Sequence, residues 1–433
     1  MAVVVAVAGG DRARPAPLAL MSSGGRPTGR DLLVWVMLAA AAIAGATRLG
    51  NLGTPPALVF DEVYYVPAAR QVLAGQEVTE ERTHPPLSKL LIAASIRLVG
   101  DRPAGWRAAS AVAGVLLLVV VYALAHALFA DRTVAAVATL LAALDGLIFV
   151  ESRIAKPDIF LALFVSTAYW AFWRALAPAR LARGPLVLAG IAAGAALATK
   201  WTAAAPLGGL AVVWVLARGR RGQAPWRAEL ATLLVALGML PVVVYLLTYL
   251  PFLQSGHTLA DVVAQQRWML AFHAGLTQGH PYQSPWWSWP LLVRPIWYEY
   301  REVAPQVARG VLAIGNPVVW WALLPAVVAA TVGAVRAGGV PERVLLVGGA
   351  LAWGQYALVP RVLFLYHFLL PLPFGVLLVA RGLGRVRATV GGGVVVAYLA
   401  LAAAWFAAFF PLLAGRPIAV PHYQRLMWFR TWI

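Results

Sequence analysis

The chain has 433 residues, of which 61% are hydrophobic and only 12% are charged, and its mean hydropathy is +0.76. So few charged side chains cannot cover the surface of a water-soluble protein of this length, which excludes that class. The net charge of +18 would suggest nucleic acid in a soluble protein, but here the basic residues gather in short segments between apolar blocks. The absence of cysteine excludes disulfides and thiolate metal sites.

The predicted elements begin with a tail, residues 1–30, whose apolar start precedes its arginines and therefore makes a poor signal peptide. Apolar blocks of suitable length then predict an all-α polytopic domain over residues 31–411, followed by an extracytoplasmic tail at 412–433. The sequence shows no run of ten-residue alternating segments, so a β-barrel is not expected. Eleven transmembrane helices are predicted, at 31–48, 106–129, 133–150, 158–177, 185–199, 203–217, 229–250, 310–332, 343–359, 362–380 and 390–411.

The orientation of this domain follows from the length of the loops that carry the basic residues. Counting all lysines and arginines favours neither side, but the short, arginine-dense loops such as Ala217–Arg227 fall on the side of the N-terminus. Short basic loops are typical of the cytoplasmic face. We therefore expect a cytoplasmic N-terminus and two long outer loops, 50–105 and 251–309, whose apolar and aromatic content predicts short helices along the membrane surface.

The first outer loop carries Asp61 and Glu62 soon after the first span, and His84 within the sequence HPPLSK. Two adjacent carboxylates at a membrane surface are poorly solvated, which raises a carboxyl pKa and suits a base that accepts a hydroxyl proton. A solvated pair, or an acid at a helix N-terminus, is the alternative. One interpretation of His84 is that it orients a phosphate or the acceptor substrate. The other is that it is an ordinary loop residue.

Several cations enter the apolar spans from the same side. Arg107 opens the second span, Lys200 stands between two short apolar blocks, and Arg361 and His367 lie close to a proline break at the span predicted at 362–380. A cation in the bilayer needs an anionic partner, which a lipid phosphate or a carboxylate supplies, unless its side chain reaches back to the interface. A proline break is tolerated where it lines a cavity.

The segment 144–158 concentrates charge between two apolar helices at the outer face. Charged groups in such a place normally face the interior of the bundle and pair with one another. A structural ion-pair corner, for example Arg153 with Asp158, is one interpretation, and we favour it for Glu151 but not for the whole segment. The charged residues are Asp145, Glu151, Arg153, Lys156 and Asp158.

The second outer loop is rich in aromatic residues around His280 and Tyr282. Tryptophan and tyrosine are common at membrane interfaces, so anchoring alone explains them, but sugars also stack on aromatic faces. Most of the unusual polar groups thus fall on one side of the predicted membrane domain. Carboxylates and cations together suit a substrate with a phosphate leaving group.

These motifs, in this order, resemble the protein O-mannosyltransferase family, which are GT-C-like membrane glycosyltransferases with a polyprenyl-phosphate sugar donor. The resemblance covers most of the chain, and the terminal MWFRTWI resembles the bacterial members. The matching pieces are FDEVYY (60–65), HPPLSK (84–89), WRAAS (106–110), LDGLIFVESRIAKPDIF (144–160), GAALATKW (194–201), HPYQSPWWSWPLLVRP (280–295), IGNPVVWW (314–321) and YHFLLPLPF (366–374).

The resemblance implies an inverting transfer of mannose from polyprenyl-phosphate-mannose to Ser or Thr hydroxyls of exported proteins, outside a bacterial plasma membrane. It implies that Asp61 is the catalytic base and that Glu62 shapes the acceptor site. No cofactor is required, although Asp61, Glu62 and a histidine could coordinate a divalent cation. Arg107, Lys200 and Arg361 are the expected donor-phosphate ligands, and the further substrate-site candidates are His84, Asp158, Arg153, His280, Tyr282 and His367.

Two departures and two alternatives accompany this resemblance. The loop Pro251–Arg309 is too short for the soluble insert of eukaryotic relatives, and Pro157 replaces a larger apolar residue beside Asp158. One alternative is another lipid-phosphate-sugar-dependent glycosyltransferase with a lipid or glycan acceptor. The other is a transporter of lipid-linked sugars, which should show internal repeats and ionisable groups at the midplane.

Overall fold

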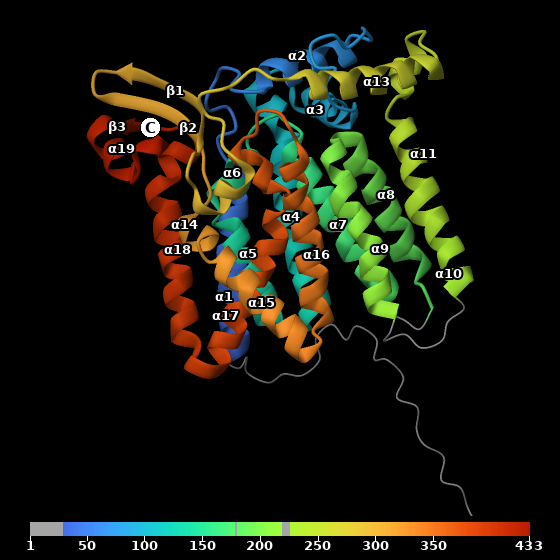
Figure 1. Ribbon diagram of the computed structural model, residues 1–433. Coiled ribbons are helices and arrows are strands. Elements are labelled where there is room, and N and C mark those ends of the chain that lie inside the picture. Colours follow the sequence, from blue (N-terminus) through green and yellow to red (C-terminus); the bar gives the residue numbers. More distant parts are fainter. Residues whose placement is uncertain (1–28, 178–179, 219–225) are drawn as a thin grey trace, which may run out of the picture.

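A computed structural model describes residues 29–177, 180–218 and 226–433. Nearly all of the predicted tail 1–30 and most of the basic loop Ala217–Arg227 lie outside the described residues. The described chain forms a bundle of roughly parallel helices, capped at one end by shorter helices and a small sheet (Figure 1). The prediction of a polytopic helical membrane domain is confirmed.

The long axis of the bundle is followed by helices that are mostly apolar. Within the described residues, six stretches are long and apolar enough to cross a membrane (Pro103–Phe129, Asp158–Leu176, Trp201–Arg218, Trp226–Leu247, Pro317–Ala337 and Gly392–Leu413), and Val34–Leu49, Arg132–Ala143 and Arg183–Thr199 are shorter apolar helices. Every predicted span falls at least partly on a helix, but the number eleven stays a prediction. The helices are α1 (Gly29–Leu49), α4 (Pro103–Phe129), α5 (Arg132–Ala143), α6 (Gly146–Glu151), α7 (Asp158–Leu176), α8 (Arg183–Thr199), α9 (Ala204–Arg218), α10 (Trp226–Leu233), the π-helix η2 (Leu234–Met239), α11 (Leu240–Leu247), α14 (Pro317–Trp320), α15 (Leu323–Ala337), α16 (Val340–Gly354), α17 (Leu372–Val390) and α18 (Gly392–Leu413).

Small residues let some of these helices approach closely. A Cβ atom at Gly194 of α8 would lie 2.6 Å from the Cβ of Val244 and 2.8 Å from the carbonyl oxygen of Pro241, both in α11. Small residues at helix interfaces increase van der Waals contact between backbones, which drives helix association in a membrane. The alanine- and glycine-rich sequence of α8 therefore packs it tightly and brings its C-terminal end, next to Lys200, into the bundle.

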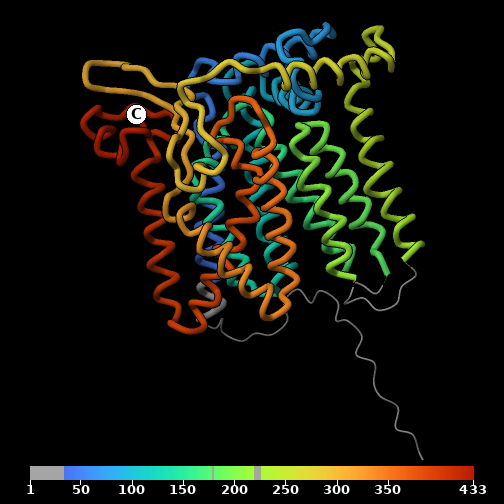
Figure 2. The backbone as a smooth tube through the Cα atoms, viewed as in Figure 1, coloured from blue at the N-terminus to red at the C-terminus, as the bar shows by residue number. Residues whose placement is uncertain are grey.

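The capping layer is built from the two predicted outer loops. The connection from α11 to the aromatic loop passes across this end of the bundle (Figure 2). The short helices predicted on the membrane surface are present there, and α2 and α3 pack on each other. The shorter helices are α2 (Glu62–Leu73), α3 (Leu87–Val99), η1 (Trp201–Ala203), α12 (Leu250–Gln254), α13 (Leu259–Gly275), η3 (Trp286–Leu291), η4 (Gln355–Leu358), η5 (Leu365–Leu369), α19 (Val420–Leu426) and η6 (Arg430–Trp432).

A three-stranded antiparallel sheet of order β1-β2-β3 is a small addition to the predicted helical fold. It consists of β1 (Ile296–Ala304), β2 (Val307–Ala313) and β3 (Pro417–Ala419). The strand β1 is rich in aromatic and β-branched residues, which favour a pleated strand. Strand β2 occupies the start of the span predicted at 310–332. The span predicted at 362–380 is also wrong at its start, because α17 begins only at Leu372, after Pro371.

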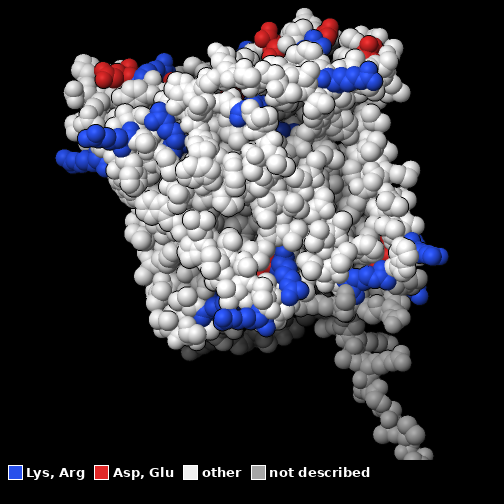
Figure 3. All heavy atoms as spheres, in the orientation of Figure 1, with Lys and Arg blue, Asp and Glu red and all other residues white. Residues whose placement is uncertain are grey.

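The two ends of the described chain lie at opposite ends of the bundle. Helix α1 begins at the uncapped end, and the chain finishes at the capped end, beside the sheet (Figure 1). On the face shown in Figure 3, basic residues predominate at the uncapped end, whereas acidic and basic residues mix at the capped end. This distribution resembles that of a membrane protein whose uncapped end carries the short basic loops.

Candidate active site

Asp61 stands at the start of α2, at the capped end of the bundle. The preceding residue, Phe60, has a φ of +48°, a left-handed conformation that is rare and costly for an aromatic residue. The half-buried Asp61 carboxylate forms no hydrogen bond or ion pair with any of the residues that the structure describes, and it does not cap α2. Burial raises the pKa of this carboxyl, and the nearby ammonium of Lys156 opposes that rise. An unpaired carboxylate of this kind suits a general base.

Arg107 lies close to Asp61, but its hydrogen bonds are all made to other groups of the protein. Its Nε and Nη2 atoms donate to the two carboxylate oxygens of Glu62, each at 2.7 Å, and both side chains are fully buried. Its remaining N–H groups donate to the carbonyl oxygens of Leu52, Pro55 and Ala57 at 2.7–3.0 Å. All five donors are therefore used. The prediction that Arg107 holds the donor phosphate is corrected, because no N–H group is left for a ligand.

The Glu62 carboxylate is likewise occupied by hydrogen bonds within the protein. Besides Arg107, its carboxylate accepts the backbone N–H of Val59 at 3.0 Å and that of Ala155 at 2.9 Å. These bonds tie the loop before Asp61 to the segment that joins α6 and α7. Glu62 therefore does not face a substrate, and the expectation that it shapes the acceptor site becomes a positioning role for the loop that carries Asp61.

A chain of buried charges crosses the end of the bundle beside Phe60. Lys200 donates to Asp158 at 3.0 Å, and Lys156 lies 3.2 Å from the other oxygen of the same carboxylate and 3.1 Å from Glu151. The hydroxyl of Tyr298 bonds to Glu151, and the Lys156 ammonium lies 3.1 Å from that hydroxyl. The interpretation of Glu151 as a structural ion-pair partner agrees with this arrangement.

Arg153 does not pair with Asp158. Its guanidinium donates to the carbonyl oxygens of Thr47, Arg48, Gly50 and Asn51 at 2.6–3.0 Å, at the end of α1. The last carbonyls of a helix have no partner within the helix, so an arginine satisfies them well. The expected ion pair of Arg153 with Asp158 is therefore wrong, and its place in the substrate site stays a prediction.

A cavity of about 240 Å³ gathers four of the predicted residues: His84, Lys200, Arg361 and His367. They come from three distant parts of the sequence, since Arg361 and His367 belong to one segment. The cavity has a third histidine, His273, which was not predicted because its part of the sequence, on α13, carries no motif. The remaining lining residues are Trp201, Thr202, Gln355, Tyr356, Val359 and Leu363. Two cations and three imidazoles in one hollow suit an anion such as a phosphate.

His273 links the walls of this cavity. One ring nitrogen accepts from the Arg361 guanidinium and the other donates to the carbonyl oxygen of Thr83 at 2.8 Å, an assignment that requires neutral His273 protonated at Nε2. The ring of His84 stacks on His273 with centroids 5.1 Å apart. Burial lowers the pKa of both histidines, so they contribute hydrogen bonds without positive charge. Lys200 and Arg361 supply the charge.

An aromatic layer connects Asp61 with the cavity, although Asp61 is not among its lining residues. The ring of Phe60 stacks on Tyr298 at 4.1 Å and meets Tyr366 edge-on at 5.7 Å. The Lys200 ammonium lies 5.5 Å from the centroid of the Tyr366 ring. The carboxylate and the cationic cavity are therefore neighbours at one end of the bundle, as a common site requires.

His280 and Tyr282 do not line the cavity. His280 is exposed, and its Nδ1 accepts the backbone N–H of Tyr282 at 3.1 Å. The Tyr282 ring packs against Arg294. Their loop nevertheless reaches the cavity wall, because the backbone N–H of Ser284 donates to the carbonyl oxygen of Leu363 at 2.9 Å. Their expected place in the substrate site stays a prediction.

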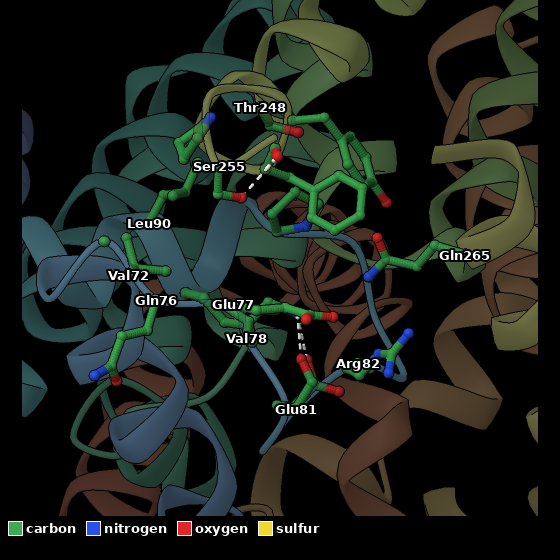
Figure 4. A pocket seen from close by; sticks show the side chains of 16 residues that line it. Val72, Gln76, Glu77, Val78, Glu81, Arg82, Leu90, Thr248, Ser255 and Gln265 are labelled. Atoms are coloured by element: carbon green, nitrogen blue, oxygen red, sulfur yellow. Dashed lines mark hydrogen bonds and ion pairs between the residues drawn. The ribbon is translucent and has the colours of Figure 1, made fainter. Parts of the chain in front are cut away.

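A second hollow lies on the other side of the segment that precedes α3. Figure 4 shows Gln76, Glu77 and Glu81 from the α2–α3 connection across from Thr248 and Ser255. No predicted site residue lines it. Its floor is fixed, since the buried Glu81 accepts from Lys89 at 2.6 Å.

The residues that the structure describes contain no group of three His, Asp or Glu side chains placed to hold a metal ion. The set considered from sequence, Asp61 with Glu62 and a histidine, is not assembled, because Glu62 is occupied by Arg107.

Comparison with known proteins first defines the class. The fold matches the S. cerevisiae protein O-mannosyltransferase Pmt1-Pmt2 complex bound to the sugar donor, with a TM-score of 0.81 and 16% identity over 94% of this chain and 93% of that one. It also matches ArnT from Cupriavidus metallidurans bound to undecaprenyl phosphate, with a TM-score of 0.59 and 18% identity over 88% and 70% of the two chains. The fold is that of GT-C membrane glycosyltransferases.

Sequence comparison then defines the family. The family model described as dolichyl-phosphate-mannose-protein mannosyltransferase matches residues 83–248, and that of the C-terminal four-transmembrane region of protein-O-mannosyltransferase matches 258–338. The polyprenol-phosphate-mannose–protein mannosyltransferase of Mycobacterium tuberculosis is 30% identical over 90% of both chains. That of Corynebacterium glutamicum is 28% identical over 93% of this chain and 94% of its own. The chain belongs to the protein O-mannosyltransferase family and is a glycosyltransferase.

Proposed function

We propose that this chain transfers mannose, with inversion, from polyprenyl-phosphate-mannose to Ser or Thr hydroxyls of exported proteins. The family and the names of its mycobacterial and corynebacterial relatives support the donor and the reaction. The capped end, which carries Asp61 and the cationic cavity, is the extracytoplasmic end in this proposal. The basic residues at the opposite end then face the cytoplasm of a bacterial cell.

One observation carries the proposal. Among the described residues, several buried or half-buried carboxylates lie around Phe60. Four of them have an ion-pair partner: Glu62, Glu81, Glu151 and Asp158. Asp61 has none within the described part of the chain. A carboxylate already bound to a cation is a weak base. Asp61 is therefore the group available to accept a proton, and it is held beside a cavity with two cations.

The reaction follows as a single displacement. Asp61 accepts the proton of the acceptor hydroxyl, whose oxygen attacks the anomeric carbon of the donor sugar from the face opposite the phosphate. The bond between that carbon and the phosphate oxygen breaks, and the phosphate leaves with the electron pair. Lys200 and Arg361 stabilise the charge that builds on this phosphate in a site with little water. His84, His273 and His367 add neutral hydrogen-bonding groups.

The test is an acceptor assay with the purified full-length protein in lipid nanodiscs. Polyprenyl-phosphate-mannose carrying labelled mannose is supplied with a peptide from an exported Ser/Thr-rich protein, and with the same peptide in which every Ser and Thr is Ala. We expect label on the first peptide alone, with an α-linkage if the donor sugar is β-linked. Label on membrane glycolipid with none on the peptide would favour the alternative lipid or glycan acceptor, and unchanged donor in both arms would contradict the proposal.

A further inference from the structure

Lys156 occupies an unusual place for an ammonium group. It is fully buried in the short connection between α6 and α7, next to Pro157. Besides Glu151, Asp158 and the Tyr298 hydroxyl, it lies 3.5 Å from the centroid of the Tyr366 ring. A cation this close to an aromatic face and out of water is strongly held. Its position is therefore fixed on every side.

The residues around Lys156 connect it to Asp61, the proposed base. Its ammonium lies 5.3 Å from the ring of Phe60, the residue before Asp61, and that ring stacks on Tyr298. The same connection reaches the base loop directly, because the backbone N–H of Ala155 donates to Glu62. The cation and the loop that carries Asp61 are thus held together by three contacts.

The balance of charge depends on this one side chain. Three carboxylates and two ammonium groups lie together here: Asp61, Glu151 and Asp158 with Lys156 and Lys200. Glu151 and Asp158 are matched by the two lysines, and Asp61 is the carboxylate left over. Without Lys156 the group would hold three carboxylates and one ammonium, and a poorly solvated carboxylate next to uncompensated negative charge takes up a proton.

We propose that Lys156 is a positioning residue for the reaction, which acts through Asp61 by keeping this base in its proton-accepting form. Lys156 does not line the cationic cavity and is not exposed at the surface, so it is not itself a catalytic residue. The inference rests on the proposed function, because it assigns Asp61 the role of base. The charged and titratable groups that act on Asp61 are Lys156, Asp158, Lys200, Glu81, Tyr65 and Tyr366. Among the charges, that of Lys156 acts most strongly.

The test compares the pH dependence of mannosyl transfer between variants of the full-length protein in nanodiscs. Lys156→Met removes the cation and keeps its length. Because the charged form of Asp61 then loses its main support, the acidic limb of the rate profile should move to higher pH by about one unit. Lys156→Arg should leave the limb near its wild-type position. Arg70→Met, which breaks an exposed ion pair with Asp101 at the same end of the molecule, is the matched control and should not move it.

A second variant allows for poor folding of Lys156→Met, which leaves Glu151 buried without its cation. Glu151→Gln/Lys156→Met removes the pair together and returns the net charge of the group to its wild-type value, so the limb should move upward by less than in Lys156→Met, and still upward because Lys156 acts on Asp61 more strongly than Glu151 does. An acidic limb that stays in place while the rate falls at every pH would overturn the inference, as would a change confined to donor KM. Absence of transfer by the wild-type protein would instead count against the proposed function.

Discussion

At the scale of single residues, the site separates groups that hold structure from groups that face a substrate. The side chains of Arg107 and Glu62 have opposite charges and lie in contact. All of their hydrogen bonds are made to each other and to the backbone. Lys200 is different, because its one carboxylate partner leaves it at the cavity wall. Charge and position in the sequence therefore indicate where the site lies, but only the bonding partners distinguish the two roles.

Arg107→Ala tests the structural role of the buried pair. Removing one partner leaves the Glu62 carboxylate buried without compensation, which costs about 3–5 kcal/mol of folding free energy. Replacing both with apolar residues, as in Glu62→Leu/Arg107→Met, should restore part of that loss. Thermal unfolding in detergent measures both. A variant Arg107→Ala as stable as wild type but with weakened donor binding would return Arg107 to the phosphate site.

Lys200→Ala tests the donor site. Loss of a charge-assisted contact to the phosphate should weaken binding of polyprenyl-phosphate-mannose by about 10- to 100-fold. Lys200→Arg keeps the charge and the pairing with Asp158, and should retain most of the affinity. Equilibrium binding of labelled donor to the purified variants gives the answer. Unchanged affinity in the alanine variant would remove Lys200 from the phosphate ligands.

The pH dependence of the wild-type enzyme is a further test at this scale. A base works only when deprotonated, and burial raises the pKa of Asp61 above the ordinary aspartate value. Activity should therefore be complete at high pH and fall, as pH decreases, through a pKa above that of an exposed aspartate. The profile of kcat/KM against pH measures it. Full activity down to the pKa of an ordinary aspartate would contradict the role of Asp61.

At the scale of elements, the apolar helices could be predicted from the sequence because their composition alone decides them. The hairpin of β1 and β2 could not, because the aromatic content of the second outer loop is equally typical of interfacial helices and β2 continues into a predicted span. The high content of aromatic and β-branched residues in β1, followed by Pro305 and Gln306, is the available signal. The joining of His84, His273 and Arg361 could not be foreseen either, since it depends on contacts between elements far apart in the sequence.

Gly310→Ala tests the contribution of the hairpin to the site. A Cβ atom at Gly310 of β2 would lie 2.5 Å from the Trp297 ring and 2.9 Å from the carbonyl oxygen of Glu299, so β1 has to move. Such overpacking costs about 1–3 kcal/mol. Tyr298 lies between these two residues, so transfer should fall together with thermal stability. Gly53→Ala, with no atom within 4 Å of the new Cβ, is the control. If the two variants transfer mannose at the same rate and unfold at the same temperature, the hairpin does not contribute to the site.

At the scale of the whole molecule, the account requires the capped end to face outward. The chain has no cysteine, so a single introduced thiol reports on one position. The exposed Thr277 lies at the capped end and the exposed Thr389 near the end of α17 at the other. Thr277→Cys should react with an impermeant maleimide in intact spheroplasts, and Thr389→Cys only after permeabilisation. The reverse pattern would place the site in the cytoplasm.

The most direct measurement is mannosyl transfer by Asp61→Asn alongside its donor binding. The amide keeps the size of the side chain and cannot accept the proton, so transfer to the peptide should fall by about 10²–10⁴-fold. Donor affinity and thermal stability should stay at wild-type values, because Asp61 has no partner among the described residues and does not line the cationic cavity. Transfer at the wild-type rate by this variant would contradict the account.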